Sequence, residues 1–522
     1  MIMARGSSES GFHSTVLLAR SIFTGTSSLG LAVTLERGLA FLANLLAARI
    51  AGVRVFGAYS LAFTTANSVA NYAGAGIGTT ANRFSGQYPK GTLEHQRLQR
   101  SLTLVSLQSA CMAGIILWLA AGPMASHLLL NPALAHLLRL ASFSAAGIIL
   151  IECLRGILIG QRSFGALLFL SVLWGGGLLL AMPLAASHGA AVMIIAQASV
   201  AATWVAASIA CRHQFGIAMP GSTGWAIDRR AWDIWRFGLA QLAGFIGLNA
   251  AGWWTSSLVS RSDPSMVQMG FYAAATQLRN IISMVPGLVS QSSYALLTEE
   301  RGSLYGGAGR VLIACTIAEM LLAMGLAGLG IATLPWTLGR LYGESFRRAE
   351  LAASLAMCTA VIQMASEPAA SRLMIVSVRL MGIINGVWTL LVIGLGSWFI
   401  RGFAAVEATN VLLLAHAVSA VLVLVSLKRL GELPRGLFGL SLTSIAAAGG
   451  FAAFAWARFT RPNQTVALSV SILVLTLALG WVAVRLACKF ALSSDDFPRG
   501  RIRDFAVALL LRSQSTPASS ET

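Results

Sequence analysis

The segment from Val55 to Ser85, VFGAYSLAFTTANSVANYAGAGIGTTANRFS, decides the fold class of this chain. It carries no charged side chain before Arg83, and most of its residues are apolar or small. A helix of about 20 such residues crosses the hydrocarbon core of a bilayer. Because a helix satisfies its own backbone N–H and C=O groups, the segment predicts a membrane-spanning helix.

Apolar segments of this length recur along nearly the whole chain. Of its 522 residues, 56% are hydrophobic and 11% are charged, whereas about a quarter are charged in a typical soluble domain. This composition excludes a water-soluble fold. The sequence therefore predicts an all-α polytopic membrane protein with about 14 transmembrane helices. The predicted spans lie near 26–48, 55–80, 101–121, 134–158, 165–187, 190–211, 237–259, 268–297, 309–333, 350–376, 380–400, 403–427, 437–457 and 466–488.

The basic residues are distributed unevenly between the two sides of these predicted spans. The net charge of +18 would by itself suit nucleic-acid binding. However, about 25 Lys and Arg residues lie on the side of the N-terminus and about 9 on the other, as expected when basic residues collect in cytoplasmic loops. The bias predicts cytoplasmic termini and argues against DNA or RNA as a partner. The first twenty residues show no removable signal peptide.

The opening segment has a counterpart without gaps later in the chain, QMGFYAAATQLRNIISMVPGLVSQSSYALLT at Gln268 to Thr298. Six spans separate the starts of the two segments, so both halves enter the membrane in the same direction. This predicts two parallel six-helix lobes related by a pseudo-twofold axis along the membrane normal, with a substrate cavity between them. The matched positions are Gly57, Tyr59, Ala62 and Gly74 with Gly270, Tyr272, Ala275 and Gly287.

The spans and the repeat together predict the organisation of the chain. The predicted parts are a cytoplasmic N-terminal segment (1–25), an N-lobe (26–211), a cytoplasmic linker (212–236), a C-lobe (237–427), two extra C-terminal helices (437–488) and a cytoplasmic tail (489–522). Residues 501–512, with apolar side chains between arginines, either lie along the inner leaflet or belong to a disordered tail.

Residues 36–85 resemble the start of the polysaccharide-transporter branch, the Wzx-like flippases, of the MOP exporter superfamily. The similar features are a helix that ends in Ala48, Arg49 and Gly52, then Phe56-Gly57 with Tyr59, and then a second helix broken by glycines. The 14-span layout and the second-lobe opening extend the resemblance over most of the chain. The superfamily also contains the lipid II flippase MurJ and the MATE transporters.

The resemblance implies a flippase that moves an undecaprenyl-pyrophosphate-linked oligosaccharide across the bacterial inner membrane by alternating access, for O-antigen, exopolysaccharide or capsule assembly. It implies no enzymatic activity, and it implies lipid-linked oligosaccharide, membrane lipids, a polysaccharide polymerase and export proteins as partners. One alternative is an ion-coupled multidrug or metabolite antiporter of the same superfamily. A membrane-embedded glycan polymerase or ligase is disfavoured, because every predicted outer loop is short.

Candidate substrate-binding residues are polar or basic side chains inside predicted spans, where a charge costs about 3 kcal/mol or more unless it is paired or hydrated. An arginine could hold the phosphates through paired hydrogen bonds, and amides could bind sugars. The alternatives are helix packing for the amides, a structural ion pair for Arg279, and contact with lipid head groups for Arg83. The candidates are Arg37, Asn44, Asn67, Asn71, Arg83 and Arg279.

Coupling to a proton or sodium gradient would need an intramembrane carboxylate, and the candidates for this role are Glu36 and Glu367. Glu36 has a second interpretation, which is to balance the neighbouring Arg37. Glu152 is expected to pair with Arg155 one turn away. Glu319 and Glu407 are further intramembrane acids. Cysteines and histidines are scattered, and no Walker motif is present, so neither a metal site nor another cofactor is expected.

Overall fold

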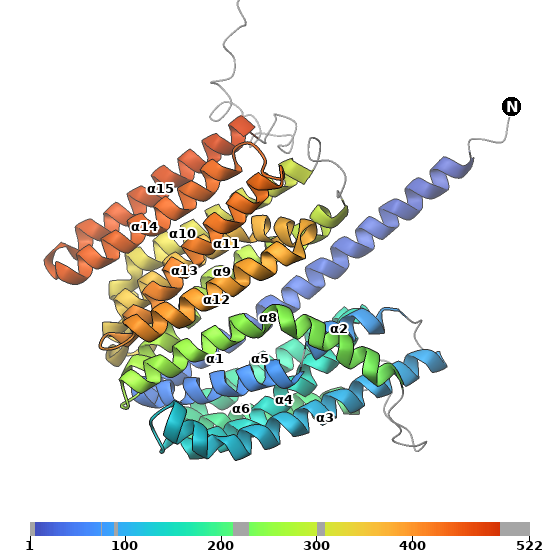
Figure 1. Cartoon of the computed structure of the whole chain (residues 1–522), viewed down its shortest axis with the longest axis horizontal. Coiled ribbons are helices and arrows are strands. Elements are labelled where there is room, and N and C mark those ends of the chain that lie inside the picture. The colour runs from blue at the N-terminus through green and yellow to red at the C-terminus, as the bar shows by residue number, and fades with distance from the viewer. Residues whose placement is uncertain (1–5, 75, 88–91, 212–228, 300–307, 491–522) are drawn as a thin grey trace, which may run out of the picture. The chain divides into compact units, whose positions relative to one another are not determined.

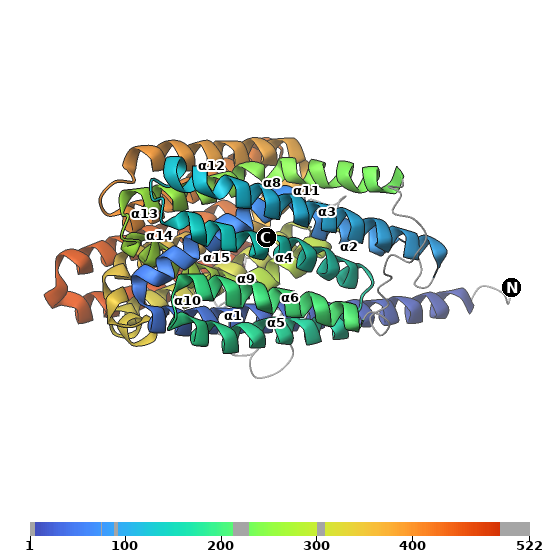
Figure 2. The ribbon, with the colours of Figure 1, turned by 90° about the horizontal axis from the view of Figure 1, so that it is seen from below.

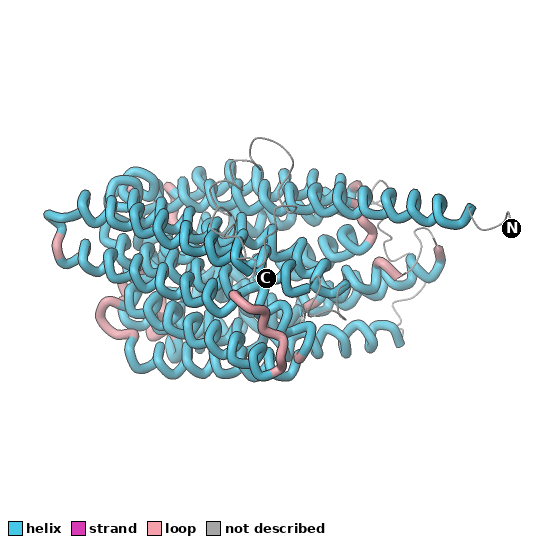
Figure 3. The backbone as a smooth tube through the Cα atoms, turned by 90° about the horizontal axis from the view of Figure 1, so that it is seen from above, coloured by secondary structure: helices cyan, strands magenta, loops and turns pink. Residues whose placement is uncertain are grey.

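The computed structural model describes residues 6–74, 76–87, 92–211, 229–299 and 308–490. In this part of the chain every regular element is a helix (Figures 1 and 3). The elements are α1 (Gly6–Gly74), α2 (Ile77–Ser85), α3 (Leu93–Pro123), η1 (Met124–Leu128), α4 (Leu134–Gly160), α5 (Phe164–Ala186), α6 (Ala190–Ala210), α8 (Arg229–Ser262), α9 (Val267–Glu299), α10 (Ala308–Tyr342), η2 (Glu344–Ala349), α11 (Glu350–Val376), α12 (Val378–Phe399), α13 (Ala404–Arg429), α14 (Leu437–Thr460), η3 (Pro462–Gln464) and α15 (Thr465–Phe490).

The predicted all-α membrane fold is confirmed. Among the described residues, 11 helical stretches are long and apolar enough to cross a membrane. The first of these, Gly30–Gly74, contains two of the predicted spans, because the backbone leaves the helical conformation at Gly52 (φ 76°, ψ 168°). The predicted spans 237–259 and 268–297 fall on α8 and α9, which are not among the 11. Predicted cytoplasmic residues 1–5, 212–228 and 491–522 lie outside the described residues.

The helix that follows Gly52 breaks a second time near its end. It was predicted to continue to residue 80, but α1 ends at Gly74 and α2 begins at Ile77, after Gly76 in a left-handed conformation (φ 67°). The Cβ of a residue in place of Gly78 would lie 3.1 Å from the backbone oxygen of Glu152, so α2 packs closely on α4 there. Gly78 therefore allows close helix packing, and Gly76 allows the turn between α1 and α2.

By their contacts the described helices divide into unit 1, which ends at Gly270, and unit 2, which starts at Phe271. In unit 1, α1 packs on α4 and α5, α4 packs on α2, α3 and α6, and α5 lies beside α6 (Figure 2). Helix α8 also belongs to unit 1, because it contacts α1, α2 and α3. The sequence instead assigned 237–259 to the C-lobe. The predicted lobe boundary therefore differs from the division by contacts, and the predicted symmetry remains a prediction.

In unit 2, α11 is surrounded by α10, α12, α13 and α14, and it is the most deeply buried of the spanning helices. The C-terminal helices α14 and α15 form an antiparallel hairpin (Figure 1) that packs on α10 and α11. A cluster of buried apolar side chains joins α10, α11, α12, α13 and α14. It contains Leu312, Ala369, Leu373, Ile384, Val423, Leu424, Leu427 and Leu437.

Candidate functional site

An ion network joins three helices inside unit 1. Arg155 of α4 lies 2.6 Å from a carboxylate oxygen of Glu36 on α1 and 2.9 Å from Glu152 on its own helix. The Ser171 hydroxyl of α5 donates a hydrogen bond to the other Glu36 oxygen, at 3.1 Å. The predicted pair of Glu152 with Arg155 is confirmed. The interpretation that Glu36 balances Arg37 is wrong, because consecutive residues of a helix point to different sides and Glu36 faces α4.

Arg37 is exposed on the surface of the protein and forms no ion pair with any residue that the structure describes. It lies inside the Gly30–Gly74 span. A bare guanidinium in contact with lipid tails would cost several kcal/mol, of order 3 or more. Arg37 therefore needs water, a lipid head group or an anionic ligand beside it.

The three candidate amides of α1 have different surroundings. Asn67 is exposed and Asn44 is half-buried, and neither side chain makes a hydrogen bond to a described residue. The Asn71 amide donates to Oδ1 of Asn249 on α8, at 3.3 Å. Asn71 thus contributes to a polar seam of the kind that holds membrane helices together, and Asn67 keeps its amide available for a ligand.

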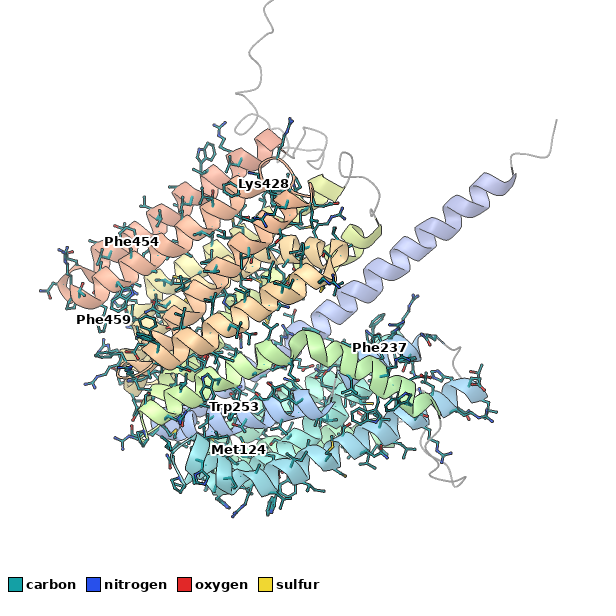
Figure 4. The ribbon with its side chains drawn as sticks, in the orientation of Figure 1. Met124, Phe237, Trp253, Lys428, Phe454 and Phe459 are labelled. Atoms are coloured by element: carbon teal, nitrogen blue, oxygen red, sulfur yellow. The ribbon has the colours of Figure 1, made fainter. Side chains whose placement is uncertain are left out.

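The same seam continues along α1 and α8. The Trp253 indole N–H donates to the Thr65 hydroxyl at 3.1 Å, and the Tyr72 hydroxyl donates to the backbone oxygen of Ile246 at 3.2 Å. Figure 4 labels Trp253 on α8. At the end of the seam, the guanidinium of Arg83 lies over the Phe237 ring, 4.4 Å from its centroid. Arg83 is exposed, so its charge is at the surface and its stem packs on an aromatic side chain.

In unit 2, Arg279 lies in the middle of α9 and is half-buried. No carboxylate among the described residues is within ion-pair distance of it, and so the structural ion pair considered as an alternative is not found there. The groups in electrostatic range of Arg279 are the Tyr272 phenol of the same helix and the His416 imidazole of α13. Neither supplies a negative charge at neutral pH.

His416 is itself held by two neighbours. Its Nδ1 lies 2.8 Å from the backbone oxygen of Leu412, one turn earlier in α13, and the indole N–H of Trp388 donates to the same nitrogen at 3.4 Å. The Trp388 ring of α12 packs edge-on against the imidazole, with the ring centroids 5.3 Å apart. The sequence did not reveal that His416 lies in electrostatic range of Arg279.

Two carboxyl groups on adjacent helices of unit 2 have no ion-pair partner among the residues described. Glu319 of α10 is completely buried. One of its oxygens accepts a hydrogen bond from the Ser290 hydroxyl of α9 at 3.1 Å, and the other is buried without a partner. Glu367 of α11 is half-buried and in electrostatic range of Glu319. Glu407, by contrast, accepts hydrogen bonds from backbone N–H groups at the start of α13 and belongs to a turn.

These observations define two groups of polar residues, each within one unit. The first consists of Arg37, Asn44 and Asn67, which are spread along α1, and the second consists of two pairs, Arg279 with His416 and Glu319 with Glu367. A basic side chain without an acidic partner can bind an anion, and a buried carboxyl without a basic partner can bind a proton or a metal cation. In the part of the chain that is described, no three His, Cys, Asp or Glu residues are grouped as metal ligands.

Comparisons with known proteins agree with this architecture. A family model described as "Polysaccharide biosynthesis protein" matches residues 22–294, which is just over half of the chain. No curated protein sequence matches the chain. A structure of lipid II flippase MurJ in an inward closed conformation is similar with a TM-score of 0.66 and 12% identity, and covers 87% of this chain and 98% of its own. An outward-facing and an inward-facing MATE multidrug-resistance transporter of the MOP superfamily match with TM-scores of 0.55 and 0.56. Both are 13% identical; the first covers 80% of this chain and 96% of its own, and the second 77% and 98%.

Proposed function

Because the chain belongs to the polysaccharide biosynthesis protein family, we propose that it is a flippase for an undecaprenyl-pyrophosphate-linked oligosaccharide. The resemblance to the MOP superfamily that the sequence predicted is confirmed by the family and by the fold. In our proposal the substrate moves from the cytoplasmic to the periplasmic or outer face of the bacterial inner membrane by alternating access. The product serves assembly of O-antigen, exopolysaccharide or capsule, and the protein carries its substrate without chemical change.

The observation that carries this proposal is Arg279, whose guanidinium lies in the middle of α9, on the predicted span 268–297, and has no carboxylate partner among the described residues. A diphosphate with attached sugars cannot enter hydrocarbon, because an isolated charge there costs of order tens of kcal/mol before it finds a partner. A guanidinium can offer two parallel hydrogen bonds to phosphate oxygens. Arg279 and a bound diphosphate would therefore each neutralise charge on the other.

In unit 1 we assign a second set of contacts to the head group. Arg37 and Asn67 are exposed within a membrane span and Asn44 is half-buried, which suits side chains that line a hydrated path. Arg37 would bind phosphate, and the amides would exchange hydrogen bonds with sugar hydroxyls. Asn71 and Arg83 are assigned weaker roles, since Asn71 is engaged by Asn249 and Arg83 packs on Phe237.

For energy coupling we propose the carboxyl groups of unit 2. Glu367 and the fully buried Glu319 lie within electrostatic range of each other without a counterion among the described residues. Binding of one proton or one sodium ion would lower the charge of this pair from −2 to −1 and relieve the repulsion between the two carboxylates. Glu36 is less suited to the role than the sequence suggested, because Arg155 and Ser171 already satisfy its carboxylate.

The orientation and partners follow from the same proposal. Both termini would lie in the cytoplasm, as the distribution of Lys and Arg predicts. A polysaccharide polymerase and export proteins would receive the translocated product, and nucleic acid would have no part in the function. An ion-coupled antiporter remains the competing proposal, because the MATE transporters have a similar fold.

The test is complementation of a strain in which the gene is deleted, with surface polysaccharide and the cytoplasmic pool of lipid-linked oligosaccharide as readouts. We expect the deletion to abolish surface glycan and to raise the lipid-linked pool. Arg279→Ala and Arg37→Ala should fail to restore export at normal membrane levels of protein. Arg279→Lys should restore it partly, because lysine keeps the charge but loses the paired hydrogen bonds.

A matched control is Arg379→Ala, which removes an exposed arginine at the start of α12. It should complement fully. Unchanged surface glycan in the deletion strain, together with new sensitivity to cationic drugs, would replace the flippase proposal by the antiporter.

A further inference from the structure

The connection between α13 and α14, residues 430–436, is held firmly against unit 2. Arg372 of α11 is buried, and its Nε and Nη2 donate hydrogen bonds to one oxygen of Glu432, at 3.2 and 2.8 Å. Leu427 before the connection and Leu437 after it are completely buried in the same apolar cluster, and Leu433 packs against that cluster. These contacts fasten both ends and the middle of the connection to unit 2.

This connection surrounds a pocket of about 390 Å³. The basic side chains of the pocket are Lys428 and Arg435, both of which are exposed and neither of which forms an ion pair with a residue in the described ranges. Glu432, the one acid within the connection, is already bound to Arg372. The residues that line the pocket are Lys428, Gly431, Leu433, Pro434, Arg435, Gly436 and Phe438.

The pocket combines two kinds of surface. Lys428 and Arg435 give it two positive charges, and the start of α14, which no side chain caps, adds the positive end of a helix dipole. Leu433, Pro434 and Phe438 give it an apolar wall, and Phe438 has 56% of its surface exposed. A ligand that fits both surfaces has an anionic head and an apolar body.

The pocket lies at the edge of the apolar zone. Figure 4 shows Lys428 and Phe459 near opposite ends of the α14–α15 hairpin, and Phe459 packs edge-on against Trp456 there. Trp side chains collect at both membrane surfaces, and basic side chains at a helix end reach the head groups. Because the pocket lies at the end of the hairpin opposite to Trp456 and Phe459, we expect it at head-group depth, on the side that the basic residues assign to the cytoplasm.

We propose that this pocket binds the head group of an anionic phospholipid from that leaflet. Lys428 and Arg435 would contact the phosphate oxygens, and Phe438, Pro434 and Leu433 would contact the glycerol and the first carbons of the acyl chains. The lipid would dock where α11, α13 and α14 converge, and would thereby fasten the C-terminal hairpin to the rest of unit 2. This inference is independent of the proposed substrate.

The experiment is native mass spectrometry of the purified full-length protein, titrated with phosphatidylglycerol or with phosphatidylcholine. A Lys or Arg near a membrane surface contributes roughly a fivefold gain in affinity for anionic lipid. The double variant Lys428→Ala/Arg435→Ala should therefore bind the tightest phosphatidylglycerol about 25-fold more weakly. Binding of phosphatidylcholine should not change.

Two controls make the result specific to the pocket. Arg429→Ala removes an exposed charge next to Lys428 that does not line the pocket, and it should change the affinity less than about twofold. Arg435→Lys should keep most of the binding and shows that the fold survives substitution at this position. Three outcomes would each overturn the proposal. The affinity for phosphatidylglycerol could fall as much in Arg429→Ala as in the double variant, or it could stay unchanged in the double variant. The wild-type protein could also bind both lipids equally well.

Discussion

Gly57 of α1 and Gly270 of α9 pack backbone against backbone. The Cβ of a residue in place of Gly57 would lie 2.7 Å from the amide nitrogen of Gly270, and one in place of Gly270 would lie 2.6 Å from a methyl carbon of Val53. The two glycines are also matched positions of the internal repeat. Small residues of this kind let membrane helices approach closely enough for their backbones to touch, so this crossing depends on both glycines.

We therefore expect Gly57→Ala and Gly270→Ala each to destabilise the protein by about 1–3 kcal/mol, the usual cost of an added methyl group in a packed core. The measurement is the midpoint of thermal unfolding in detergent, followed by fluorescence-detected size exclusion. The double variant should cost less than the sum of the two single variants, because one helix displacement relieves both clashes.

Gly252→Ala in α8 is the control for this prediction, because nothing lies within 4 Å of a Cβ at that position. Alanine is the better helix former, so this variant should be as stable as the wild type or slightly more stable. If Gly57→Ala and Gly252→Ala unfold at the same temperature, the crossing is not as tight as the structure describes.

Arg155→Ala should be among the most destabilising single substitutions in unit 1. It leaves the carboxylates of Glu36 and Glu152 without their shared cation, and loss of one partner of a buried ion pair typically costs about 3–5 kcal/mol. The side chains are partly exposed, so we expect the lower end of that range. Arg97→Ala, which breaks an exposed pair with Glu94, is the matched control and should cost less than about 1 kcal/mol.

A second substitution separates charge pairing from packing. Glu36→Gln should partly rescue Arg155→Ala, because it removes one of the two carboxylates that the first change leaves unpaired. Additive losses in the double variant would show that Arg155 and Glu36 do not act as a pair.

The sequence could predict the features that depend on local spacing. The apolar length of the segments predicted all 11 helical stretches that could cross a membrane, and in addition two spans on α8 and α9 that are not among them. The interval of three residues predicted that Arg155 contacts Glu152. It could not predict that Glu36 bonds to Arg155, because 119 residues separate them and the adjacent Arg37 offered the same charge. Nor could the sequence show that Asn71, unlike Asn67, bonds to another helix, since its partner Asn249 is 178 residues away. Long-range polar contacts depend on helix rotation, which small-residue packing sets.

The C-terminal hairpin depends on one buried arginine. Arg458 of α14 lies 2.6 Å from a carboxylate oxygen of Glu350, at the start of α11. It also donates hydrogen bonds to the backbone oxygen of Ile331 on α10, at 2.9 Å, and to the Ser469 hydroxyl of α15, at 3.2 Å. We expect Arg458→Ala to cost about 3–5 kcal/mol and to expose the 460–465 connection to proteolysis. Arg461→Ala, an exposed neighbour, should leave melting and cleavage unchanged, and the same result for Arg458→Ala would contradict the prediction.

The turn before α9 predicts a dependence of stability on pH. Partial burial raises the pKa of Asp263, but hydrogen bonds outweigh it, so that the pKa lies below its ordinary value. They come from the Ser265 hydroxyl at 2.6 Å, the Ser265 N–H at 3.0 Å and the Gln268 N–H at 2.8 Å. A carboxyl whose pKa is lower in the folded state binds fewer protons there than in the unfolded state. It therefore stabilises the fold above the ordinary pKa of about 4 and loses this effect as the pH falls through the folded value.

Asp263→Asn removes this effect while it keeps the size of the side chain. Because a negative charge near a helix N-terminus contributes about 0.3–1 kcal/mol, we expect the variant to unfold at a lower temperature than the wild type at pH 7. The two melting temperatures should converge as the pH is lowered from about 5 to 3. Asp233→Asn, which alters an exposed carboxylate of α8, should follow the wild type at every pH. The difference in melting temperature between wild type and Asp263→Asn would stay constant across this pH range if the amide and the carboxylate differed only in packing. That result would mean that the charge of Asp263 does not stabilise the start of α9.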